Sequence, residues 1–309
     1  MCYFTPQNFF RATLLLALNF WAMPVIIFRF LSHFPLSFLH ALGAALGYVV
    51  YLSSPTYRKR LRKNIEGAGF GSSLSSAIRE AGKGILELAF IWCAPPARVL
   101  KSARIENWDV VQAALGEKRG IIFLTPHLGC FEILAQAIAE RFAARPKLTV
   151  MFRPPRKKAL KPLIEGARAR ENLLLAPANL AGVRIMARAL RNGEAIGLLP
   201  DQVPDHGEGV WADFFGRPAY TMTLSAKLQR MSGAPLILSY AERLPHGAGF
   251  VLHFVRFEEK LGDTPEEQAH AINRAMEELI SRCPAQYLWS YNRYKEPRGT
   301  PANSVESKA

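Results

Sequence analysis

The stretch TPHLGCFE, residues 125–132, places a histidine and a carboxylate directly after an apolar run. His127 follows the segment GIIFL, and Glu132 comes five residues later. A carboxylate that holds an imidazole fixes its tautomer and stabilises the imidazolium, so such a pair works as a general base toward a hydroxyl. Because no serine lies beside the pair, we expect the hydroxyl to belong to a substrate.

The spacing of this pair requires a particular local structure. On one regular helix, residues five apart point about 140° away from each other. His127 and Glu132 can therefore meet only if the histidine lies in a turn before a helix that begins near Cys130. Pro126 and Gly129 favour such a turn. Glu132 would then lie in the first helical turn, where the helix dipole favours a carboxylate.

The same residues also have ordinary structural interpretations, which spacing alone does not exclude. Glu132 can simply favour the helix start, with His127 as a hydrogen-bonded loop residue. We expect no metal, because the pattern is not HExxH and no third ligand is marked. Cys130 beside His127 would suit a thiol nucleophile, as in a thiol hydrolase, but burial at the helix start is the commoner use of such a cysteine.

A second candidate region is LLPDQVPDHGEGVWADFFGRPAYT, residues 198–221. It begins as a buried strand that ends at Asp201 and Gln202 and continues as a long Gly- and Pro-rich loop, and long loops at strand ends are often functional. Asp201 is placed to bind a polar group of a substrate or to orient a basic residue. The loop also carries apolar side chains that either line an apolar channel or simply pack down: Val210, Trp211, Phe214 and Phe215.

A third candidate region is the basic segment FRPPRKKALKPLIEGARAR, residues 152–170. Arginine suits bidentate binding of phosphate or carboxylate. The middle of the segment, residues 156–158, is expected to be a solvated basic face. Arg168 and Arg170 lie nearer the next strand and are better placed to point at the site, and Arg153 ends the preceding strand.

Short apolar segments alternate with amphipathic ones from about residue 105 onward. Strands are predicted over 120–126, 147–153, 172–177, 194–202, 235–243 and 249–257, and helices over 72–92, 131–144, 157–170, 182–193, 221–233 and 264–283. This alternation predicts an α/β fold with a mixed, mostly parallel central sheet flanked by helices, in which the last two strands pair antiparallel.

The N-terminal region differs in composition from the rest. Residues 12–28 and 30–52 contain no Asp, Glu, Lys or Arg, and uncharged runs of about 17 to 25 residues are candidates for membrane helices. Prolines interrupt both runs, so an interfacial arrangement also fits, and whether a segment spans the bilayer stays open. The cluster YRKRLRK (57–63) favours a cytoplasmic location and contact with anionic lipid. The GxxxG spacing of Gly43 and Gly47 is a weak signal for close helix packing.

These features predict four regions. Residues 1–55 form a membrane anchor or interfacial helices, 56–104 a helical connecting region, 105–295 the α/β domain and 296–309 a flexible tail. The formal net charge of +14 favours an anionic partner. The four cysteines form no CxxC pair, which argues against a disulfide framework or zinc ribbon.

The ordered set of motifs resembles a known family. The anchor, TPHLGCFE, MFRPPR followed by GARAR, LLPDQ leading to DFFGRPAYT, and a terminal PAQYLWSYNRYK together resemble the late-acting lipid A acyltransferases of Gram-negative inner membranes, within the lysophospholipid acyltransferase superfamily. The resemblance implies transfer of a fatty acyl group from acyl carrier protein to a hydroxyl of a lipid A precursor, at the cytoplasmic face of the inner membrane. It implies no metal or redox cofactor.

On this resemblance His127 is the base and Glu132 its partner, and Arg168 and Asp201 match polar positions important in the family. Arg153, Arg170 and Gln202 complete the expected substrate-binding set. One alternative is an acyltransferase of the same superfamily that acts on another glycolipid or phospholipid. Another is a membrane-bound lipid- or nucleic-acid-binding module with a structural histidine. We expect no nucleic acid, because the basic residues are not interleaved with an aromatic platform.

Overall fold

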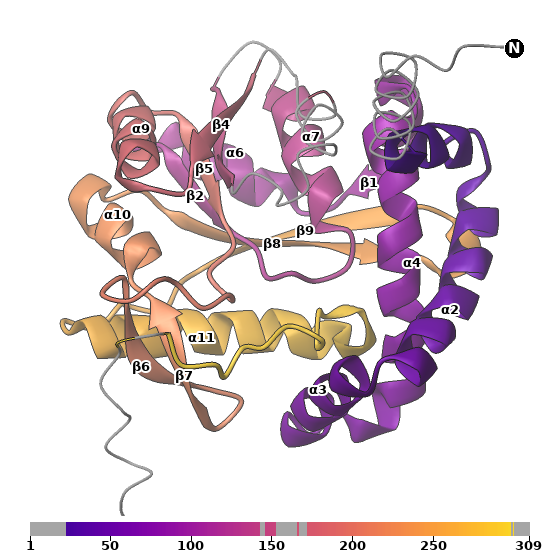
Figure 1. Cartoon of the computed structure of the whole chain (residues 1–309). Helices are drawn as coiled ribbons and strands as arrows, with labels where there is room; N and C mark the ends of the chain where they lie inside the picture. Colours follow the sequence, from indigo (N-terminus) through magenta and orange to yellow (C-terminus); the bar gives the residue numbers. More distant parts are fainter. Residues whose placement is uncertain (1–22, 143–145, 153–165, 167–171, 298, 300–309) are drawn as a thin grey trace, which may run out of the picture.

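The computed structural model describes residues 23–142, 146–152, 166, 172–297 and 299 (Figure 1). A seven-stranded sheet has the spatial order β1-β9-β8-β2-β5-β3-β4. Neighbouring strands run parallel except for β8 and β9, which confirms the predicted mixed sheet. The strands are β1 (Ala103–Ile105), β2 (Ile121–Leu124), β3 (Leu148–Phe152), β4 (Leu173–Pro177), β5 (Ala195–Leu198), β8 (Leu236–Arg243) and β9 (Phe250–Arg256).

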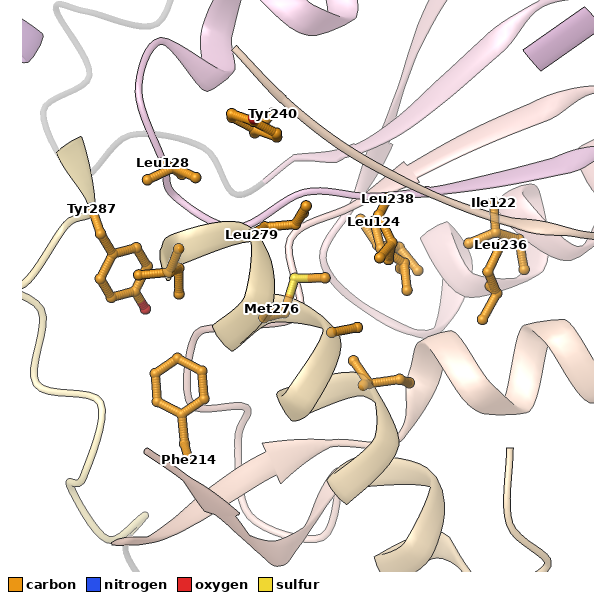
Figure 2. Packing of buried hydrophobic residues seen from close by; sticks show 14 of the residues in the cluster. Ile122, Leu124, Leu128, Phe214, Leu236, Leu238, Tyr240, Met276, Leu279 and Tyr287 are labelled. Atoms are coloured by element: carbon orange, nitrogen blue, oxygen red, sulfur yellow. The ribbon is translucent and has the colours of Figure 1, made fainter. Parts of the chain in front are cut away.

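Helices cover both faces of the sheet. Successive side chains of a strand point to opposite faces, so each strand contributes apolar side chains to both layers. In β2, Ile121 and Phe123 pack with helices α4 (Leu74–Cys93), α6 (Trp108–Gly116) and α7 (Phe131–Phe142). Ile122 and Leu124 pack on the other side with α9 (Leu180–Arg191), α10 (Leu224–Ser232) and α11 (Pro265–Arg282). Figure 2 shows the second cluster, in which Met276 and Leu279 of α11 lie beneath the sheet. Four apolar residues in a row are therefore required in β2.

The helix ends follow the chemistry of the sequence. Thr264 caps α11, since its side chain accepts from the backbone N–H of Glu267 while the Glu267 carboxylate accepts from that of Thr264. Gly193 follows α9 and Gly233 follows α10, both in left-handed conformation. These boundaries confirm the predicted helices at 182–193 and 264–283 and the predicted end of the helix near Gly233.

Residues 23–31 are helical and lead into α2 (Leu36–Ser53), α3 (Pro55–Gly67), α4 and α5 (Pro96–Lys101). α2 lies against α4 (Figure 1), and glycines allow the contact. A Cβ on Gly47 would come within 2.1 Å of the Ile78 carbonyl oxygen, and one on Gly82 within 2.0 Å of the Gly43 oxygen. The GxxxG spacing therefore does pack two helices closely. Among the described residues, α2 is the one helix long and apolar enough to cross a bilayer by length and composition.

The predicted loop after Gln202 contains regular structure. β6 (Gly209–Phe214) and β7 (Arg217–Met222) form an antiparallel hairpin that packs on α11. Phe214, the last residue of β6, is buried in the core beside Tyr287 (Figure 2). This aromatic side chain therefore packs down and lines no channel. The prediction of a loop was wrong because glycine and proline masked the strand pattern of β6 and β7, whereas the packing of Phe214 matches one of the two interpretations that the sequence left open. The short elements α5, β1 and α6 also escaped prediction.

Candidate active site

His127 and Asp201 come together because of strand order. β2 and β5 are parallel neighbours, and Leu124 faces Leu198 in their register. His127 and Asp201 each follow these leucines by three residues, so both lie at the same carboxyl edge of the sheet. Ligands of open α/β sheets collect at this edge. The positions predicted for His127 and Asp201, each at a strand end, are confirmed.

The His127 imidazole is held on both nitrogens. Nδ1 lies 2.7 Å from Asp201 Oδ1, and the His127 backbone N–H donates to Asp201 Oδ2 at 2.8 Å. Nε2 lies 3.0 Å from the amide nitrogen of Gln202. With Nδ1–H donating to the carboxylate, Nε2 carries the lone pair and accepts from the Gln202 amide. This is the tautomer that a general base at Nε2 requires.

Asp201 is buried while its histidine reaches the surface. The Asp201 side chain is 1% exposed and that of His127 15%. Burial alone would raise the pKa of Asp201, but the charge of His127, its two hydrogen bonds and the charge of Arg293 hold that pKa below its usual value. Asp201 therefore stays ionised.

Two buried side chains from the C-terminal segment complete the surroundings of Asp201. Burial, followed by the charge of Asp201, raises the pKa of Tyr287, so its hydroxyl keeps its proton. Arg293 is 2% exposed. Its guanidinium donates to the main-chain carbonyl oxygen of Tyr220 and to Thr221 Oγ1, both at 2.7 Å. The positive charge of this guanidinium helps to lower the pKa of Asp201. We did not predict either role; the only signal was the aromatic-rich terminal motif PAQYLWSYNRYK, which contains both residues.

The turn that carries His127 is fixed by main-chain contacts. The N–H of Leu288 donates to the His127 oxygen, and that of Gly129 to the Gln286 oxygen, both at 3.1 Å. Gly129 has φ +59°, and a Cβ there would come within 1.9 Å of the Ala241 oxygen. Glycine is thus required twice over, by the conformation and by the close approach to β8.

Glu132 lies in the first turn of α7, as predicted, but it is not the carboxylate on Nδ1. Its Oε2 accepts a hydrogen bond from Trp92 Nε1 of α4 at 3.2 Å. The ring beside the imidazole is Phe131, edge to face at 4.9 Å between centroids. The direct partner of His127 is therefore Asp201, for which the sequence had left two roles open, binding a polar group of the substrate or orienting a basic residue; the contact fits the second. A catalytic contribution of Glu132 remains a prediction.

Cys130 is 2% exposed. Burial, together with the charge of Glu87, raises the pKa of its thiol well above the usual value. The thiolate that a cysteine nucleophile needs is therefore disfavoured. Its backbone N–H donates to the Ala241 oxygen at 2.9 Å, so it serves the fold.

Three of the expected substrate-binding residues, Arg153, Arg168 and Arg170, lie outside the described residues. Gln202 is described and contacts His127 directly. Within the described part of the chain, no cluster of three or more His, Cys, Asp or Glu side chains is arranged to hold a metal ion.

Comparison with known proteins adds independent information. A family model described as "Bacterial lipid A biosynthesis acyltransferase" matches residues 10–296. A lipid A biosynthesis lauroyltransferase of Escherichia coli K12 is 27% identical over 255 residues, which are 81% of this chain and 77% of the relative. A lipid A biosynthesis palmitoleoyltransferase of the same organism is 28% identical over 225 residues, 72% of this chain and 71% of the relative.

Proposed function

The chain belongs to the bacterial lipid A biosynthesis acyltransferases, and from this premise we propose that it transfers a fatty acyl chain from acyl carrier protein to a hydroxyl of a lipid A precursor. Family membership makes it an acyltransferase of lipid A synthesis. Acyl carrier protein as the donor, and His127 as the base, are the proposed parts. The observation that carries the mechanism is the contact of 2.7 Å between His127 Nδ1 and the buried Asp201 carboxylate.

The proposed reaction begins at Nε2 of His127. A substrate hydroxyl takes the place of the Gln202 amide and gives its proton to Nε2 as its oxygen attacks the thioester carbonyl. Asp201 stabilises the imidazolium formed in this step. When the tetrahedral intermediate collapses, the C–S bond breaks and the departing thiolate takes the proton from the imidazolium. The products are an ester and the free thiol of the carrier.

The oxyanion of this intermediate requires hydrogen-bond donors. The N–H groups of the three residues after His127 already have acceptors, because Leu128, Gly129 and Cys130 donate to the Pro126, Gln286 and Ala241 oxygens. The remaining candidates are the first two N–H groups of α7, those of Phe131 and Glu132, which have no acceptor within the helix, and the Gln202 amide once it leaves Nε2. Glu132 is proposed to assist from the start of α7, where Trp92 holds its carboxylate.

A location at the cytoplasmic face of the inner membrane is proposed from the N-terminal helices. α2 is buried along Leu39, Gly43 and Gly47 and exposes apolar side chains elsewhere, among them Leu42 and Val49. Because one side of α2 is packed along α4, only the other side is available to lipid, which favours an interfacial helix over a spanning one. The basic α3 follows immediately and suits anionic headgroups.

The function is tested with purified protein, acyl-[acyl carrier protein] and a lipid A precursor, with mass spectrometry of the lipid product. The proposal predicts a mass increase of one acyl residue and release of free carrier protein. Lipids from a strain that lacks the gene should lose one secondary acyl chain from lipid A. Unchanged lipid A in that strain, with another lipid lacking an acyl chain, would instead identify a different glycolipid or phospholipid as the acceptor.

A further inference from the structure

A pocket apart from the His127 site lies between α3, the β6–β7 hairpin and the segment after Tyr291. Its volume is about 510 Å³, within the range of small-ligand sites. Four basic side chains line it, namely Lys59, Arg60, Lys63 and Arg217. We call it the basic pocket. The reaction proposed above uses none of these residues.

Among the described residues, no ion pair neutralises the cations of the basic pocket. Within the described part of the chain, no carboxylate forms an ion pair with any of the four cations. Glu296 is the one acidic residue of the lining. Arg62, on the same helix but outside the pocket, does pair with Glu66 at 3.2 Å. Like charges held together around a concave surface favour an anionic ligand.

One cation of the pocket is held in a fixed orientation. The Arg217 guanidinium lies 3.6 Å from the centre of the Tyr294 ring. Tyr294 is itself fixed, because its hydroxyl donates to the Phe214 oxygen at 2.9 Å. A stacked guanidinium keeps its N–H edge available for two parallel hydrogen bonds, which match a phosphate. Trp211 adds an aromatic surface to the same lining.

The residues that line the basic pocket adjoin both the N-terminal helix α2 and the surroundings of Asp201. α3 follows α2, whose exposed apolar side chains suit a lipid surface. Asn292 of the lining is flanked by Tyr291, which accepts from the N–H of Val203, and by Arg293, whose charge acts on Asp201. The lining therefore includes the helix that directly follows α2 and the C-terminal segment whose neighbouring residues contact the surroundings of Asp201.

We propose that the basic pocket binds a phosphate group on the sugar headgroup of the lipid acceptor, an inference that rests on the proposed function. Several cations around a cavity of this size suit a compact dianion attached to a sugar, with the aromatic wall against the ring. Binding of a convex acidic protein would favour basic side chains that protrude from the surface, and binding to a bilayer would favour a flat basic face. The concave shape therefore favours the phosphorylated headgroup over either of these partners.

The test measures binding of two lipids in detergent micelles. One is bis-phosphorylated lipid A, and the other is the same lipid after phosphatase treatment. The Lys59→Gln/Lys63→Gln double variant and Arg217→Gln should each raise the Kd for the phosphorylated lipid about tenfold and change that for the dephosphorylated lipid less than about twofold. Arg62→Gln, which removes a charge from the same helix outside the pocket, should leave both values within about twofold.

Three results would overturn the proposal. Unchanged affinity for the phosphorylated lipid in both pocket variants would remove the site. An equal loss for both lipids would show that phosphate is not recognised. A rise in the Kd for acyl carrier protein, with the Kd for both lipids unchanged, would assign the pocket to a protein partner. Because binding is measured without turnover, these results are independent of whether wild-type protein transfers an acyl chain, which is the test of the proposed function itself.

Discussion

His127 and Asp201 lie at equal distances along the chain from two leucines that face one another across parallel strands, Leu124 of β2 and Leu198 of β5. The sheet register therefore brings the imidazole and the carboxylate to the same edge, where they make a contact of 2.7 Å. Two independent strand ends must be placed correctly for this contact to form. The pair is a product of the whole sheet rather than of a local turn.

Asp201→Asn should lower kcat by about a hundredfold or more. An asparagine amide that donates to Nδ1 would move the imidazole proton to Nε2, where the base needs its lone pair. Glu132→Gln is the matched comparison, because it removes the charge of the carboxylate that Trp92 holds. We expect the smaller loss from Glu132→Gln. Initial rates at saturating substrate measure both, and a larger loss from Glu132→Gln would make Glu132 the principal carboxylate.

Part of this site was predictable from the sequence. Local pattern was sufficient for β2, α7 and the turn between them, because apolar runs and Gly129 mark them. The partner of His127 was not predictable, since it depends on which strand lies beside β2. Local spacing suggested Glu132, five residues away, whereas the sheet supplies Asp201 from far along the chain. Likewise, nothing local marks Arg293 as a buried cation, because its contacts come from β7.

Gly129→Ala should lower the free energy of unfolding by more than about 1 kcal/mol and reduce kcat. The new Cβ would meet the Ala241 oxygen at a residue with positive φ, so the turn must shift and carry His127 with it. Gly69→Ala is the control for φ alone, since a Cβ at Gly69 has open space. Denaturant unfolding and initial rates measure the two effects. A variant as active as wild type would show that the turn tolerates displacement.

The buried ion pair of Glu87 and Arg243 should make stability depend on pH. Arg243 Nε donates to Glu87 Oε2 at 2.6 Å, and His40 Nε2 lies 3.1 Å from the same oxygen. Burial would raise the pKa of Glu87, but the charge and hydrogen bonds of Arg243, with those of His40, lower it from 4.5 to about 2. This contribution to stability is fully present above pH 4.5 and is lost as the pH falls toward 2.

Glu87→Gln should therefore destabilise the protein at neutral pH by about 3 kcal/mol and flatten the fall in stability below pH 4.5. Glu66→Gln is the control, because Glu66 pairs with Arg62 at the surface and its loss should cost less than about 1 kcal/mol. Denaturant unfolding at a series of pH values measures both. An unchanged pH profile in Glu87→Gln would assign the acid sensitivity to other groups.

Leu42→Glu combined with Val49→Glu should weaken binding to vesicles of anionic phospholipid at least tenfold, because both side chains lie on the exposed side of α2. Leu180→Glu introduces the same charge at an exposed leucine of α9 and should leave vesicle binding unchanged. Co-sedimentation with vesicles measures the partition, and circular dichroism checks the fold. Equal binding by the double variant and wild type would mean that α2 does not contact lipid.

The most direct test of the central claim is the rate of acyl transfer by His127→Ala from acyl-[acyl carrier protein] to a lipid A precursor. Because the imidazole is 15% exposed and makes its contacts through Asp201 and Gln202, the variant should fold, as its unfolding transition can verify. We predict a loss in kcat of at least about a hundredfold, with the KM for the lipid nearly unchanged. A folded His127→Ala protein with turnover close to wild type would contradict the account.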